Sequence, residues 1–213
     1  MGFEHASDEM EALSRTAARL RPWPVRGKPL PNLLFFTDPE RTPHPERVAE
    51  RLPPGSAVVF RAFGAPDATE RGARLREITR RRGLTLLVGA DAALAQAVEA
   101  DGLHLPERLV PTLPGLRGTR PDWLITIAAH GLAAARAGAA AGADALVVSP
   151  VFPSRSPSAG APLGVAGLRG IVEAVEVPVY ALGGVRADTA ARLVDTGIVG
   201  IAAVEALDAP LGA

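Results

Sequence analysis

The sequence contains no cysteine, a single lysine and few aromatic residues. Without cysteine, no disulfide framework is possible. Because Lys28 is the only lysine, a Schiff-base mechanism would need this residue, and a Walker P-loop is excluded. Aromatic residues make up only 4% of the chain, so alanine, valine and leucine must fill the core. Small side chains of this kind suit helices that pack on a parallel sheet.

The sequence also lacks strong charge and long apolar segments. The formal net charge is zero, and the arginine run 80–82 is too short to bind nucleic acid by itself. No apolar run approaches the roughly 18 residues of a membrane span, and charges throughout residues 1–20 are inconsistent with a signal peptide. We therefore expect a cytoplasmic protein that binds a small molecule rather than nucleic acid or a membrane. A homo-oligomer is compatible with the sequence.

Eight short apolar runs extend from residue 32 onward, and helical segments separate most of them. The apolar residues within each run are nearly continuous, as in strands that are covered on both faces. The expected strands are 33–37, 56–62, 84–90, 102–105, 123–129, 144–150, 177–183 and 199–204. The expected helices are 68–82, 91–100, 131–142, 165–175 and 188–197, with weaker, proline-containing segments at 41–53 and 107–117. Eight β/α units predict a single (β/α)₈ barrel over residues 32–213.

The alternative fold is an open doubly wound sheet, which would place a glycine-rich turn after its first strand. Residues 37–39 are instead Thr-Asp-Pro, so the barrel is favoured. Residues 1–31 form an N-terminal extension, in which 8–20 is a helix that could cover the bottom of the barrel and 21–31 is a linker.

Two of the expected helices carry local signals. In segment 68–82 the helical spacing puts four side chains on one face: Ala73, Leu75, Ile78 and Thr79. In segment 188–197, Asp188 is a plausible N-cap and Gly197 is a plausible C-terminal glycine.

Functional side chains of a barrel lie at the carboxyl ends of its strands. His130 ends the fifth expected strand, and its imidazole suits it to act as a general acid/base unless it has a capping or core role. The pair Gly183-Gly184 and the pair Val204-Glu205 follow the last two strands, which is the usual phosphate seat. The carboxylate of Glu205 opposes a phosphate there unless it points away or is protonated.

Three further candidates stand at strand ends. Ser154 and Ser156, with Arg155 between them, could cradle a second anion or belong to a solvated loop. Arg61 follows an apolar run, so it needs Asp38 or a substrate phosphate as a partner, because a buried unpaired charge is costly. His104 could face the barrel interior or be structural.

The ordered motifs of the chain resemble those of the thiamine phosphate synthase/TenI family over residues 33–207. These motifs are DGLHLPE (101–107), His130, AAGADALVVSPVFPS (140–154), PLG (162–164), VPVYALGGV (177–185) and GIAAVEAL (200–207). The resemblance implies a (β/α)₈ barrel. It also implies one of two activities. Family synthases couple hydroxymethylpyrimidine pyrophosphate to a thiazole phosphate with magnesium, whereas TenI enzymes tautomerise a thiazole carboxylate phosphate without a metal.

The chain departs from the synthase pattern where the pyrophosphate and magnesium would be held. Where the resemblance implies an Asn-Asp pair, this chain has Gly89-Ala90, and where it implies a second carboxylate, this chain has Leu109. Pro157 stands in place of the lysine, and Ala128 and Glu205 stand in place of two serines. Of a Gln-x-Arg-x-Lys pattern in the second strand, only Arg61 remains. We therefore expect no ordered magnesium at the top of the barrel.

These departures favour a TenI-like member that binds a thiazole phosphate without a cofactor, because His130 matches the acid/base histidine of TenI. One alternative is a diverged thiamine phosphate synthase, with Asp91 and Glu107 as shifted magnesium ligands and Arg155 in place of the lysine. A second alternative is a non-catalytic ligand-binding barrel.

Overall fold

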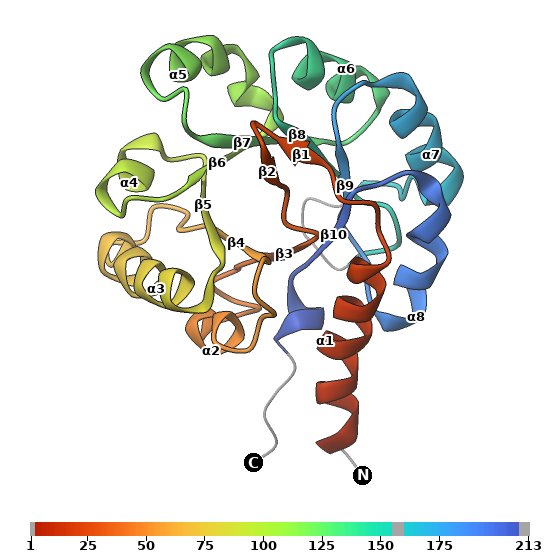
Figure 1. The fold of residues 1–213 in the computed structure, drawn as a ribbon, viewed down its shortest axis with the longest axis horizontal. Helices are drawn as coiled ribbons and strands as arrows, with labels where there is room; N and C mark the ends of the chain where they lie inside the picture. Colours follow the sequence, from red (N-terminus) through yellow and green to blue (C-terminus); the bar gives the residue numbers. More distant parts are fainter. Residues whose placement is uncertain (1–2, 155–159, 209–213) are drawn as a thin grey trace.

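A computed structural model describes residues 3–154 and 160–208 of the chain (Figure 1). Eight parallel strands close a barrel: β3 (Leu33–Phe36), β4 (Ala57–Phe60), β5 (Thr85–Gly89), β6 (Gly102–Leu105), β7 (Leu124–Ala129), β8 (Ala145–Val148), β9 (Val179–Ala181) and β10 (Gly200–Ala203). Each strand pairs with the next along the chain, and β10 closes the ring on β3. The predicted (β/α)₈ barrel is confirmed.

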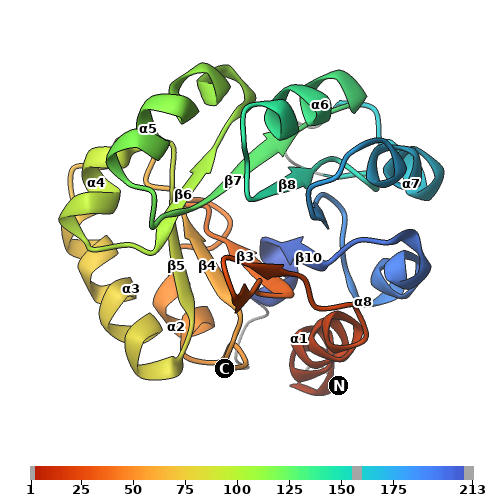
Figure 2. The ribbon, with the colours of Figure 1, turned by 45° about the horizontal axis from the view of Figure 1, so that its top comes forward.

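Helices surround the barrel, as Figure 2 shows. They are α2 (Pro45–Ala49), α3 (Ala68–Arg82), α4 (Ala92–Ala97), α5 (Leu113–Thr119), α6 (Leu132–Ala140), α7 (Gly164–Ala174) and α8 (Ala187–Ala190). Three 3₁₀ segments complete the list: η1 (Glu107–Thr112), η2 (Ala191–Thr196) and η3 (Glu205–Leu207). Within the described residues, no helix combines the length and the apolar character that a membrane crossing requires.

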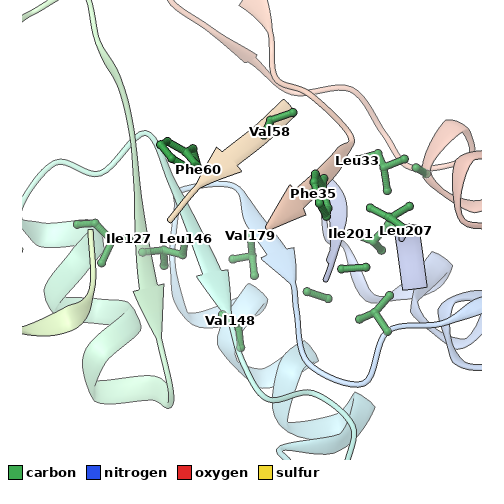
Figure 3. Packing of buried hydrophobic residues seen from close by; sticks show 14 of the residues in the cluster. Leu33, Phe35, Val58, Phe60, Ile127, Leu146, Val148, Val179, Ile201 and Leu207 are labelled. Atoms are coloured by element: carbon green, nitrogen blue, oxygen red, sulfur yellow. The ribbon is translucent and has the colours of Figure 1, made fainter. Parts of the chain in front are cut away.

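Two apolar layers hold the strands in place. Alternate strand residues point outward and pack against the helices, among them Phe35, Val58, Leu146 and Ile201 (Figure 3). The residues between them, such as Leu34, Val59, Val147 and Ala202, belong to a second cluster that fills the barrel interior. Because both faces of every strand are covered, the apolar runs are continuous rather than alternating.

The N-terminal extension contains the predicted helix, but its position differs from the prediction. Helix α1 (Phe3–Ala18) lies beside α8 and over β10 and β3, so it covers the outer wall of the barrel (Figures 1 and 2). Met10, Leu13 and Ala17 are buried on the face that makes this contact. No helix follows η3 within the described residues, so α1 covers the wall that an eighth helix would occupy.

The bottom of the barrel is closed by part of the expected linker. It forms a two-stranded antiparallel ribbon, β1 (Pro24–Val25) and β2 (Lys28–Pro29). Between these strands, Arg26 donates hydrogen bonds to the carbonyl of Pro121 at 2.6 Å and to Oδ1 of Asp144 at 2.7 Å. Both acceptors precede strands, so they lie at the amino ends of β7 and β8. The prediction that the helix covers the bottom was therefore wrong.

Three local predictions about helices need correction. Ala73 is exposed in α3, and Gly72 takes its place on the buried face. Asp188 lies inside α8 and pairs with Arg186, which is the N-cap residue. Residues 188–197 are not one α-helix, because η2 follows α8, although Gly197 does end this segment in the left-handed conformation.

Candidate active site

One cavity of about 990 Å³ opens at the carboxyl ends of the strands, and all eight strand ends contribute to its lining. A space of this size is typical of small-molecule sites. The predicted site residues that line it are Arg61, His130, Ser154, Gly183, Gly184 and Val204. Ser156 and Arg155 lie outside the described residues. The structure thus brings the described candidates to one cavity, while their roles remain predictions.

His130 is held by Glu107, the first residue of η1. Glu107 Oε1 accepts a hydrogen bond from the backbone N–H of His130 at 2.6 Å and lies 2.8 Å from Nδ1 of its ring. When Nδ1 carries the proton, this contact is a donated hydrogen bond and Nε2 keeps its lone pair. His130 lines the cavity, whereas Glu107 does not. The arrangement suits the imidazole for accepting and returning a proton within the cavity.

Arg61 meets Asp38, which is one of the two partners expected for it. Its Nε donates to the carbonyl of Thr37 at 2.7 Å, and its guanidinium lies 3.4 Å from the Asp38 carboxylate. Burial and the nearby charge of Arg41 lower the pKa of Arg61 to about 10, against the opposing effect of Asp38. Since Arg41 pairs with the same carboxylate at 3.3 Å, the three side chains carry a net positive charge beside the cavity.

His104 points into the barrel interior. It is 8% exposed, its Nδ1 lies 3.0 Å from the Thr126 hydroxyl, and its ring makes an edge contact with Phe36. Burial, together with the charges of Arg61 and His130, lowers the pKa of His104 to about 3. His104 is therefore neutral at physiological pH and forms part of the cavity floor.

The backbone conformation and the packing of the Gly183-Gly184 turn both require glycine. Their φ angles are +89° and +64°, in the region that side chains disfavour. A Cβ on Gly183 would lie 2.7 Å from Cα of Pro150, and one on Gly184 would lie 2.5 Å from the carbonyl of Pro153. Close approach to the β8–α7 loop therefore requires glycine at both positions, whether or not a phosphate binds there.

Two carboxylates line the cavity near this turn. Glu9 of α1 accepts a hydrogen bond from the backbone N–H of Ala187 at 2.7 Å, at the start of α8. Glu205 of η3 lines the same cavity. Glu9 was not anticipated, because nothing in the sequence indicates that the N-terminal helix reaches the top of the barrel. An anion here must approach with both carboxylates turned away or protonated.

The magnesium of family synthases does not fit the residues present. Ala90 and Leu109 offer no side-chain oxygen where the resemblance implies carboxyl or amide ligands. Asp91 caps α4 by accepting a hydrogen bond from Leu94 N–H at 2.9 Å, and Glu107 is bonded to His130. Among residues 3–154 and 160–208, no three acidic, histidine or cysteine side chains form a cluster that could hold a metal ion.

A closed barrel of eight parallel strands, with a cavity at the carboxyl ends of those strands, defines the (β/α)₈ class. The family model described as "Thiamine monophosphate synthase" matches residues 33–207, and the chain belongs to this family.

Individual relatives agree with this assignment. A thiamine-phosphate synthase of Pyrococcus furiosus is 34% identical over 178 residues, which cover 82% of this chain and 86% of the relative. A thiamine-phosphate synthase of Archaeoglobus fulgidus is 35% identical over 184 residues, 84% of this chain and 86% of the relative. The solved structure of a thiamine phosphate pyrophosphorylase from Pyrococcus furiosus superimposes with a TM-score of 0.72 at 31% identity, covering 84% of this chain and 91% of that chain.

Proposed function

We propose that this chain binds a thiazole phosphate in the thiamine branch of metabolism and catalyses a proton transfer on it. His130 is the general acid/base in this proposal: Nε2 accepts a proton from a substrate carbon and returns it at another position of the same molecule. Such a tautomerisation is balanced without an external oxidant, reductant or co-reactant. The observation that carries the proposal is the Glu107–His130 pair, which leaves Nε2 available beside the cavity.

The remaining residues have supporting roles in this proposal. The substrate phosphate has two candidate seats, the Gly183-Gly184 turn with Val204 and the positive cluster around Arg61. The first is flanked by Glu9 and Glu205, so the cluster offers the more favourable charge. Ser154 lines the cavity and is a candidate contact of the ligand, whereas Ser156 is a predicted contact that lies outside the described residues.

The second candidate is the synthase reaction, in which the thiazole displaces pyrophosphate from a pyrimidine pyrophosphate. The names of the relatives favour this candidate over the first, since those quoted above are thiamine-phosphate synthases or pyrophosphorylases. The described residues offer it less support, because residues 3–154 and 160–208 contain no cluster of acidic, histidine or cysteine side chains that would hold a metal to balance the pyrophosphate charge.

Two parallel assays separate the candidates. The purified protein is incubated either with a thiazole carboxylate phosphate alone or with hydroxymethylpyrimidine pyrophosphate, thiazole phosphate and magnesium. Isomerised thiazole in the first mixture supports proton transfer. Thiamine phosphate and pyrophosphate in the second, without isomerisation in the first, would establish the synthase instead. Binding of thiazole phosphate without turnover in either mixture would indicate a non-catalytic barrel.

A further inference from the structure

Phe63 stands exposed at the mouth of the cavity. Phe63 lies in the loop after β4. It is 70% exposed, more than any other large hydrophobic residue that the structure describes. It lines the same cavity as His130 and Arg61. Its backbone has a φ of +48°, a conformation that bulky residues rarely adopt.

Phe63 covers one side of Arg61. The guanidinium carbon lies 5.3 Å from the centroid of the Phe63 ring and 5.6 Å from that of Phe36. Arg61 is also tied to Thr37 and Asp38 through its polar atoms. The guanidinium thus contacts two rings. The ring of Phe63 is held beside it, with most of its surface open to solvent.

The contact with Arg61 does not account for this placement. A cation–π contact at an exposed site changes an equilibrium by a factor of about two to five. A residue held in a sparsely populated backbone region costs a factor of roughly five to more than a hundred. An open apolar ring adds no compensating burial. In the protein without ligand, the contacts of Phe63 therefore do not offset the cost of its backbone conformation. Strained backbone conformations of this kind cluster at sites where a ligand binds.

We infer that Phe63 is the platform on which the planar aromatic ring of an anionic ligand stacks, while Arg61 and Arg41 attract the anionic group. The two arginines share only the Asp38 carboxylate, which leaves positive charge for the ligand. The exposed face of Phe63 supplies ring-to-ring contact, which favours planar ligands over saturated ones of equal charge. The inference rests on the proposed function where it identifies the ring as a thiazole.

The test uses two monophosphate esters of six-membered rings, phenyl phosphate with a planar aromatic ring and cyclohexyl phosphate with a saturated ring, at a pH where both phosphates are dianionic. Their dissociation constants are measured by calorimetry for the wild type, Phe63→Leu and Phe63→Tyr. We expect phenyl phosphate to bind the wild type more tightly than cyclohexyl phosphate. Phe63→Leu should raise the dissociation constant of phenyl phosphate by about 3- to 10-fold and that of cyclohexyl phosphate by less than twofold. Phe63→Tyr, which keeps the ring, should retain the wild-type preference.

Trp23 provides a matched control, because among the residues whose burial the structure describes it is the other exposed large aromatic, at 42%, and it precedes the ribbon at the bottom of the barrel. Trp23→Leu should change neither affinity. The inference is overturned if phenyl phosphate fails to bind the wild type, if Phe63→Leu weakens both probes equally, or if it changes neither. It is also overturned if Phe63→Leu alters the mass in solution rather than the ring preference, since Phe63 would then contact a second copy.

The inference and the proposed function can fail separately. If the ring preference depends on Phe63 but thiazole carboxylate phosphate is not isomerised, the platform stands and the proposed reaction is wrong. If isomerisation depends on His130 but Phe63→Leu preserves the preference for phenyl phosphate, the reaction stands and the platform is wrong.

Discussion

Glu107 Oε1 contacts His130 twice, at 2.6 Å from its backbone nitrogen and at 2.8 Å from Nδ1 of its ring. The two residues are 23 positions apart and belong to loops that follow adjacent strands, β6 and β7. One carboxylate oxygen thereby holds both the loop and the ring. In the proposed reaction, Glu107 is therefore a positioning residue for His130.

Removal of Glu107 should reduce turnover more than substrate binding. With no acceptor at Nδ1, the ring of Glu107→Ala can rotate and exchange tautomers. We expect kcat for the proposed isomerisation to fall by about 10- to 100-fold, with KM within twofold of the wild type. Glu107→Gln keeps an acceptor oxygen and should lose less.

Nitrogen NMR of the His130 ring provides a readout independent of activity. The wild type should show the proton on Nδ1, whereas Glu107→Ala should show a mixture. Glu70→Ala, at an exposed glutamate of α3, is the control and should behave as the wild type. An unchanged His130 tautomer and unchanged kcat in Glu107→Ala would refute the positioning role.

His104 should make the fold less stable in mild acid. Its pKa is about 3 in the folded protein and about 6.5 in an unfolded chain. Between these values the unfolded state binds more protons, so stability is lost as the pH falls from 6.5 towards 3. Between pH 7 and pH 5 this residue should cost about 2 kcal/mol of unfolding free energy. Urea titrations of His104→Gln should show a pH dependence smaller by that amount, and an identical dependence in both proteins would contradict the assignment.

The Gly183-Gly184 turn should not tolerate a methyl group. Gly183→Ala combines a left-handed backbone with a contact of 2.7 Å to Pro150, and we expect a loss of about 2–4 kcal/mol in unfolding free energy. Gly170→Ala is the matched control, because it lies within α7 and its added Cβ would meet nothing within 4 Å. That control should be neutral or stabilise the protein by up to about 1 kcal/mol. Equal stabilities of the two variants in denaturant would argue against the packing described here.

Asp91 should act on stability and not on metal binding. Its carboxylate caps α4 through Leu94 N–H, so Asp91→Ala should cost about 1 kcal/mol. Asp91→Ser keeps a capping oxygen and should recover most of the loss. If calorimetry with magnesium and pyrophosphate shows tight binding that Asp91→Ala abolishes, Asp91 is a metal ligand and the synthase candidate gains support.

The barrel was predictable because its signal is local and repeated. The run 145–148 is apolar throughout, as expected for a strand covered on both faces. His130 could be placed at the cavity from its position after such a run. The strand ends were predicted up to two residues too long, since apolar residues continue into the loops that close the cavity.

Other features depend on contacts between distant segments, which the sequence does not display. Glu9 reaches Ala187 across 178 positions, and Arg26 reaches Asp144 across 118. The ribbon 24–29 falls within the predicted linker, because two-residue strands have no periodic signal. The backbone of Phe63 is equally hidden, since a left-handed conformation is not expected of a phenylalanine.

The most direct test of the account compares wild type and His130→Asn in the isomerisation of a thiazole carboxylate phosphate, with ligand affinity and unfolding free energy measured in parallel. The account predicts that the wild type isomerises the substrate and that His130→Asn loses about 10²- to 10⁴-fold in rate. Affinity and stability should stay near the wild-type values, because His130 is exposed at the cavity and contributes little to the core. The contradicting result is a wild type that leaves this substrate unchanged, or a His130→Asn protein that is active but unstable.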